Sequence, residues 1–225
     1  MNAAVSSRPH TAHHRRPRRG RLVAVGALAA TALLPSSVAG AQSPPEVDPA
    51  LMVPTLNPDV APWTCFETGD GVICKGSSHE SYTNEPFGLQ CDGQDVYITG
   101  RFDQRWTRWH TADGLATKTS VHMASPDDTF SLTPTGDGPS LTISGHFNWH
   151  FVYGVPGDPS SRTLTEVGAI YLGRSSAGGP LLLHDAGEVT FAPGAEFEVV
   201  ASSGGIHDAY SDPAAIDRII CDALT

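Results

Sequence analysis

Histidines are the residues of this chain best suited to site chemistry, because an imidazole can bind a metal ion or move a proton near neutral pH. His146 and His150 are four residues apart, a spacing that on a helix would direct both rings to one metal ion. The segment alternates like a strand, however, and four strand residues span about 13 Å. The two rings then share a face without chelating one ion together, so no metal site is predicted.

Two His-Asp dipeptides have the residue types of a general acid–base pair: His184-Asp185 and His207-Asp208. Adjacent strand residues point to opposite faces, so His184 and Asp185 should not meet if that segment is regular. His207-Asp208 follows two glycines in a predicted loop, where polar residues are most often solvated. The chain has no nucleophile elbow, phosphate-binding loop or dinucleotide fingerprint, so no catalytic residue is assigned.

Tryptophans are the second group of candidates, because aromatic side chains on strands can line a surface for a small molecule. The same alternation is also typical of ordinary core packing. The candidate ligand-binding residues are therefore His146, His150, Trp106 and Trp149, and no cofactor is expected.

Short strands separated by turns are the elements that must position these residues. Between Ser140 and Tyr153 apolar residues alternate with polar ones, as in an antiparallel strand with one face in the core and one in water. Ala112-Asp113-Gly114 is the clearest hairpin signal. Further strands are predicted at 96–99, 104–111, 115–124, 162–172, 181–185, 188–191 and 196–201.

About eight or nine consecutive, hairpin-linked strands predict an all-β fold, an antiparallel meander. Because the connections are short and none is a long crossover, closure into an up-and-down, calycin-like β-barrel is favoured. A two-sheet β-sandwich is the alternative. Only the C-terminus predicts a helix, over residues 213–223, with Asp212 as the N-cap and Pro213 at the first helical position.

Four cysteines, Cys65, Cys74, Cys91 and Cys221, predict two disulfides in an exported chain. A chain reversal between Gly69 and Asp70 would place Cys65 opposite Cys74, which favours that pair and leaves Cys91 for Cys221. The competing pattern joins Cys65 to Cys91 and Cys74 to Cys221. In the favoured pattern the second bridge ties the terminal helix to an early strand.

The N-terminus has the three parts of an export signal. A cationic region without acids, Arg15 to Arg21, is followed by the apolar stretch Leu22–Leu34 and by small residues that end at Ala41. The apolar stretch would span about 20 Å of a hydrocarbon core about 30 Å thick, so a cleaved signal over residues 1–41 is expected. The export route, general or twin-arginine, stays open. Residues 42–62 then form a proline-rich extended leader before a single β domain, 63–225.

Cleavage would make an acidic chain more acidic. Lys and Arg fall from 14 to 8 while all 24 acids remain, so the formal net charge moves from −10 to −16. Such a surface repels phosphate groups and anionic lipid, which argues against nucleic acid and membrane as partners of the mature chain. The oligomeric state cannot be read from these features.

The chain resembles a family of small exported proteins of high-GC Gram-positive bacteria that have no established activity. The resemblance covers most of the chain after residue 62 and implies a secreted single domain, without assigning any site residue. It rests on Trp63-Thr64-Cys65, Gly69-Asp70-Gly71, Cys91-Asp92-Gly93, Val155-Pro156-Gly157-Asp158, His184-Asp185-Ala186-Gly187 and Ile220-Cys221-Asp222-Ala223-Leu224.

The expectation for function is a secreted, non-enzymatic barrel that binds a small apolar or amphipathic ligand. One alternative is an extracellular isomerase, cyclase or hydrolase that uses His146, His150 or His207. The other is a surface interaction protein without a pocket.

Overall fold

The computed structural model describes residues 43–176, 178, 181–194, 198–205 and 214–225. The predicted export signal, the His207-Asp208 pair and the predicted helix start at Asp212 and Pro213 lie outside these residues.

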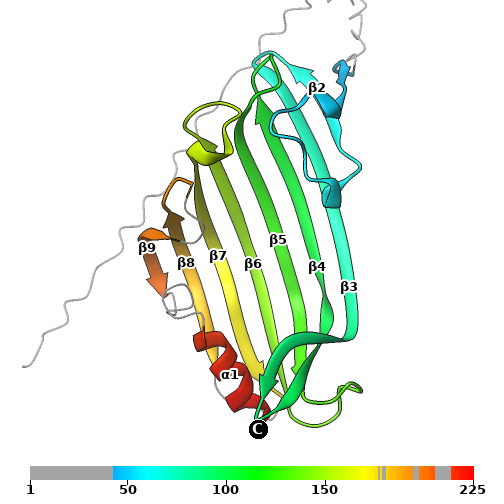
Figure 1. Cartoon of the computed structure of the whole chain (residues 1–225), viewed down its shortest axis with the longest axis vertical. Coiled ribbons are helices and arrows are strands. Elements are labelled where there is room, and N and C mark those ends of the chain that lie inside the picture. The colour runs from blue at the N-terminus through cyan, green and yellow to red at the C-terminus, as the bar shows by residue number, and fades with distance from the viewer. Residues whose placement is uncertain (1–42, 177, 179–180, 195–197, 206–213) are drawn as a thin grey trace, which may run out of the picture. The chain divides into compact units, whose positions relative to one another are not determined.

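A single antiparallel sheet of nine strands makes up most of the described chain, and its strands lie side by side in sequence order (Figure 1). The predicted all-β meander is therefore confirmed. The strands are β1 (Glu46–Val47), β2 (Thr64–Thr68), β3 (Gly71–Cys91), β4 (Gln94–His110), β5 (Ala116–Ser131), β6 (Ser140–Tyr153), β7 (Arg162–Ser175), β8 (Leu183–Phe191) and β9 (Val199–Gly205). Three 3-10 turns, η1 (Pro49–Leu51), η2 (Pro58–Val60) and η3 (Pro159–Ser161), and one helix, α1 (Ala214–Leu224), complete the described elements.

The sheet is open, so the predicted closed barrel is wrong. Closure requires the two edges of a sheet to pair, whereas in the described chain β9 pairs with β8 alone and β1 with β2 alone. The edges also differ greatly in length, because β1 has two residues and β9 has seven. The alternative of two packed sheets is not seen either, since all nine described strands belong to one sheet.

The hairpin from β3 to β4 is longer than the sequence pattern predicts. β3 has 21 residues, and the part beyond Lys75 pairs with β4 only, because β2 is too short to follow it. That part is rich in glycine, serine and charged residues and includes Pro86, which are poor strand formers. The next hairpin, through Asp113 and Gly114, turns where it is predicted, and Gly114 has the positive φ of 80° that favours glycine.

Register divides the side chains between two faces of the sheet. Trp106, Val121 and Trp149 stand opposite one another on β4, β5 and β6, and we call their side the aromatic face. The adjacent row contains Arg105, His122 and Asn148, on the side we call the histidine face. The alternation predicted for β6 is confirmed: Leu141, Ile143, Phe151 and Tyr153 are buried.

Register irregularities line up across the middle of the sheet. Four of them begin within one residue of a regular row made of Asp103, Ala124, His146 and Ala169, and the one between β3 and β4 begins three residues further on, after Gly100. Bulges sharpen the local bend and twist of a sheet, so this bulge line separates two halves. The shifts fall between Tyr82 and Glu85, Thr99 and Asp103, Ser125 and Asp128, Ser144 and His146, and Ala169 and Tyr171.

Helix α1 covers one half of the aromatic face. Its buried Ile220 and Leu224 pack with Val96, Leu141 and Leu183 from three strands. A disulfide between Cys91 and Cys221 fastens the helix to the end of β3. The helix lies where the sequence predicts it, within one residue at each end.

The proline-rich segment, residues 43–63, which we call the N-terminal segment, covers part of the other half, and it is folded rather than simply extended. Its buried residues Met52 and Leu56 pack on the disulfide between Cys65 and Cys74, and Val60 is buried as well. Both bridges therefore have the pairing that the sequence favours. Figure 1 shows this segment at the opposite end of the sheet from α1.

Candidate functional site

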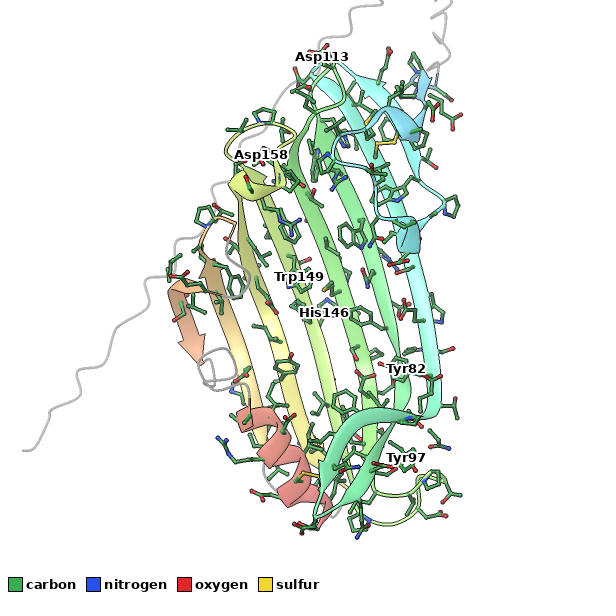
Figure 2. All side chains as sticks on the ribbon, viewed as in Figure 1. Tyr82, Tyr97, Asp113, His146, Trp149 and Asp158 are labelled. Atoms are coloured by element: carbon green, nitrogen blue, oxygen red, sulfur yellow. A yellow bond between two sulfur atoms is a disulfide. The ribbon has the colours of Figure 1, made fainter. Side chains whose placement is uncertain are left out.

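Aromatic side chains gather between the two covered ends of the aromatic face. Trp149 on β6 (Figure 2) packs edge-on against Phe151, with ring centroids 6.1 Å apart, and lies 6.2 Å from Phe147. Trp106 packs edge-on against Trp63 of the N-terminal segment at 6.3 Å. Four of the side chains here stay partly exposed although they pack on the buried Val121 and Met123: Phe102, Trp106, Phe147 and Trp149.

The Trp149 indole has an unused donor. Its Nε1 is shielded from solvent and has no hydrogen-bond partner among the described residues. A buried donor without an acceptor costs about 1–3 kcal/mol, which is a local cost to the stability of the fold at this position. In contrast, the Trp106 indole donates to the Gln104 side chain, 2.7 Å away.

Two carboxylates are buried in the aromatic face near these rings. Glu166, opposite Trp149, is 2% exposed, and Asp185, opposite Tyr171, is 1% exposed. Burial raises the pKa of Tyr171, and the negative charges of Glu166 and Asp185 raise it further. Neither carboxylate is without a partner. Sequence reasoning missed Glu166; the signal was an acid at an inward position between Leu164 and Gly168.

A second polar group lies on the aromatic face at the bulge line. The Tyr82 hydroxyl (Figure 2) donates to one oxygen of Asp128, and the Ser125 hydroxyl donates to the other. These residues come from β3 and β5 and meet over Gly100 of β4, whose missing side chain leaves the room. Burial, and after it the hydrogen bond to Asp128, raise the pKa of the Tyr82 phenol. The group presents a carboxylate beside the aromatic cluster.

Arg108 is a buried cation under the N-terminal segment. Its guanidinium donates to the carbonyls of Pro54 and Thr55 at 2.9 and 3.4 Å, and to the hydroxyls of Thr119 and Tyr153 at 3.3 and 3.4 Å. The described acceptors are neutral, so the group holds the segment on the sheet by hydrogen bonds rather than by an ion pair.

His110 lies close by and is 3% exposed. Burial, and then the charge of Arg108, lower its pKa to about 4. The backbone of Val72 acts in the opposite direction and raises this pKa, although neither ring nitrogen of His110 has a hydrogen-bond partner among the described residues. His110 is therefore neutral at physiological pH.

The histidine face carries further imidazoles of the described chain. His150 Nδ1 is 3.3 Å from the Ser120 hydroxyl, and His79 Nδ1 is 2.5 Å from Asp103 Oδ1. The His79 hydrogen bond is the main reason that the pKa of Asp103 is lowered. His146 (Figure 2) packs edge-on against His122, with ring centroids 4.6 Å apart.

The four residues singled out from sequence are thus divided by the sheet. Trp106 and Trp149 share the aromatic face, whereas His146 and His150 lie on the histidine face. His184 and Asp185 also point to opposite sides, as predicted: His184 is exposed and Asp185 is buried.

Within the described ranges, no group of three or more His, Cys, Asp or Glu side chains is arranged to hold a metal ion. The described part of the chain also lacks a helix with the length and apolar character needed to cross a membrane. No protein-family model matches the chain, and no curated protein or solved structure matches it. The resemblance to small exported proteins of high-GC Gram-positive bacteria stays a prediction.

Proposed function

We propose that the chain is a secreted, non-enzymatic protein that binds a small apolar or amphipathic ligand on its aromatic face. Two disulfides support an oxidising, extracellular compartment, because reducing compartments rarely keep them. The ligand would lie on an open sheet rather than inside a closed barrel.

The observation that carries the proposal is the aromatic cluster between two covers. Trp106, Phe147 and Trp149 keep exposed surface, while the N-terminal segment and α1 bury the aromatic face on either side of them. Aromatic rings supply large apolar contact area in rigid positions, which suits the binding of an apolar group.

Polar groups on the same face favour an amphipathic ligand. The Asp128 carboxylate follows Met123 along β5 and is oriented by Tyr82 and Ser125. A ligand with an apolar body on the aromatic cluster could place a donor group at this carboxylate. The same side of the sheet would then bind both ends.

The enzymatic alternative gains no support from the histidines. His146 and His150 lie on the face opposite Trp106 and Trp149, so a molecule held by the tryptophans would not reach these imidazoles. This separation favours a binding role over catalysis by His146 or His150.

Native mass spectrometry of the protein recovered from its own culture medium tests the proposal directly. We expect a retained small molecule that organic extraction releases. The emptied protein should then bind a neutral fluorescent probe such as Nile red saturably, and the extracted compound should displace it. A protein that carries no ligand and fails to bind the probe would show the proposal to be wrong.

A further inference from the structure

We propose that His122 and His146 on the histidine face together bind a divalent transition-metal ion, Cu²⁺ most tightly. The two residues come from β5 and β6 and are diagonal neighbours, because His122 stands opposite Asn148 and His146 stands opposite Ala124. The small Ala124 side chain leaves room for the His146 ring beside His122. This site does not depend on the ligand proposed for the aromatic face.

The spacing of the rings fits a shared metal ion. A nitrogen–metal bond of about 2.0–2.1 Å puts an imidazole centroid about 3.2 Å from the ion. Two rings bound at a right angle then have centroids about 4.5 Å apart, and two rings at the tetrahedral angle about 5.2 Å apart. The observed centroid separation of His122 and His146 is 4.6 Å. This value lies nearer the right angle preferred by Cu²⁺ and Ni²⁺ than the tetrahedral angle preferred by Zn²⁺.

Asn148 fixes the tautomer that such a site needs. Its side-chain oxygen is 3.1 Å from His122 Nδ1, so this nitrogen carries the proton and donates it to the amide. His122 Nε2 then keeps its lone pair for a metal ion. Metal-binding histidines usually donate their second nitrogen to an acceptor in this way.

Other histidines of this face are less well placed. His150 is four strand residues from His146, about 13 Å by strand geometry, and its Nδ1 lies near the Ser120 hydroxyl. His79 is held by Asp103. Since the described residues include no three-ligand group, water would complete the coordination of an ion held by His122 and His146.

Two charged side chains border the site. Arg105 lies directly opposite His122, and its positive charge would oppose a bound cation. Its side chain is exposed, however, and its charge also helps to lower the pKa of Asp103 and so to keep that carboxylate ionised. Asp103 is in the same row as His146, two strands away. The large excess of acids over bases in the whole chain favours cations generally.

Titration of the purified chain with Cu²⁺ at about pH 7.5, where free imidazole is neutral, tests the site. Calorimetry gives the affinity, and pulsed electron paramagnetic resonance counts the coordinated imidazoles. We expect one equivalent bound by two imidazoles. His122→Ala and His146→Ala should each weaken that equivalent at least about tenfold and leave one imidazole in the signal. Asn148→Ala should weaken Cu²⁺ binding about tenfold, because the amide oxygen no longer holds the proton of His122 on Nδ1.

His150→Ala is the matched control, since it removes an imidazole from the same strand and face and should leave the affinity unchanged. The chain that begins at Gln42 lacks His10, His13 and His14. In the uncleaved chain, any ion held by these three residues would persist in all four variants and so be told apart from this site. The proposal would be overturned if the parent chain binds no Cu²⁺, or if His122→Ala and His146→Ala do not both weaken the binding. Equal loss in His150→Ala would overturn it as well.

Discussion

Trp106 and Trp149 stand on the same face of the sheet, two strands apart, each directly opposite Val121 on the strand between them. Val121 is fully buried, whereas both tryptophans keep exposed surface. A flat molecule lying over Val121 would therefore touch two indoles at once. Trp109, three residues from Trp106, points to the other face, where the Lys118 ammonium lies 5.1 Å from its ring centre.

Replacement of either tryptophan on the aromatic face should weaken ligand binding. We expect Trp106→Ala and Trp149→Ala each to raise the dissociation constant of the neutral probe about tenfold, which corresponds to about 1.4 kcal/mol. Trp109→Ala is the control and should bind the probe like the parent. Fluorescence titration measures all three, and an equal effect of Trp109→Ala would place the probe elsewhere.

The two disulfides should contribute unequally to stability. Cys91–Cys221 joins residues 130 positions apart and Cys65–Cys74 joins residues nine apart. In the chain-entropy description these loops correspond to about 5 and about 3 kcal/mol. Urea unfolding of the Cys91→Ser/Cys221→Ser and Cys65→Ser/Cys74→Ser double variants should show this order. The reverse order would mean that burial of the shorter bridge outweighs loop length.

His110 should make the protein less stable in mild acid. Its pKa is about 4 in the folded chain and 6.5 for the free side chain. The unfolded chain therefore takes up the proton first as the pH falls from about 6.5 towards 4, and stability is lost over that range. Between pH 7 and 4.5 the loss should be about 2 kcal/mol. His110→Leu should reduce the loss of unfolding free energy with falling pH, as measured by urea unfolding. If the variant loses as much stability as the parent, other titrating groups cause the loss.

Gly100 should tolerate no side chain. A Cβ atom there would collide with the Asp128 carboxylate and crowd the Tyr82 ring. We expect Gly100→Ala to cost about 1–3 kcal/mol in unfolding free energy. The substitution should also move the phenol pKa of Tyr82 back towards its ordinary value. Titration monitored by ultraviolet absorbance measures this change. Gly69→Ala, with open space around the new methyl group, should change stability by less than about 0.5 kcal/mol.

Cleavage of the predicted export signal should leave a chain that begins at Gln42. Intact mass is expected to correspond to residues 42–225 with both disulfides formed, less one ammonia if the N-terminal glutamine cyclises. Recovery of the uncleaved chain from the membrane fraction would contradict this prediction.

Local chemistry made part of the fold predictable. The turn at Gly69 and Asp70 aligns Cys65 with Cys74, so the disulfide pairing followed from counting residues on either side of the reversal. The same counting separated His184 from Asp185. Both predictions needed only the two-residue period of a strand and one turn.

Global features were not predictable in this way. Closure depends on whether distant edges match, and the alternation of β6 is the same in an open and a closed sheet. The partner of His146 depends on the register between β5 and β6, including the irregularity at Ser125–Asp128. Without that register, the sequence alone does not tell whether His122 or His79 is the neighbour of His146.

The bulge line separates the sheet into two halves. Five consecutive strand pairs lose their regular register within a few residues of one another, so the ladders of backbone hydrogen bonds are interrupted between the two halves. One half is braced by the N-terminal segment and the other by α1 through Cys91–Cys221. Because the ladders are interrupted at this line, we expect backbone amides beside Tyr82 and Asp128 to exchange with solvent before those of the regular ladders in either half.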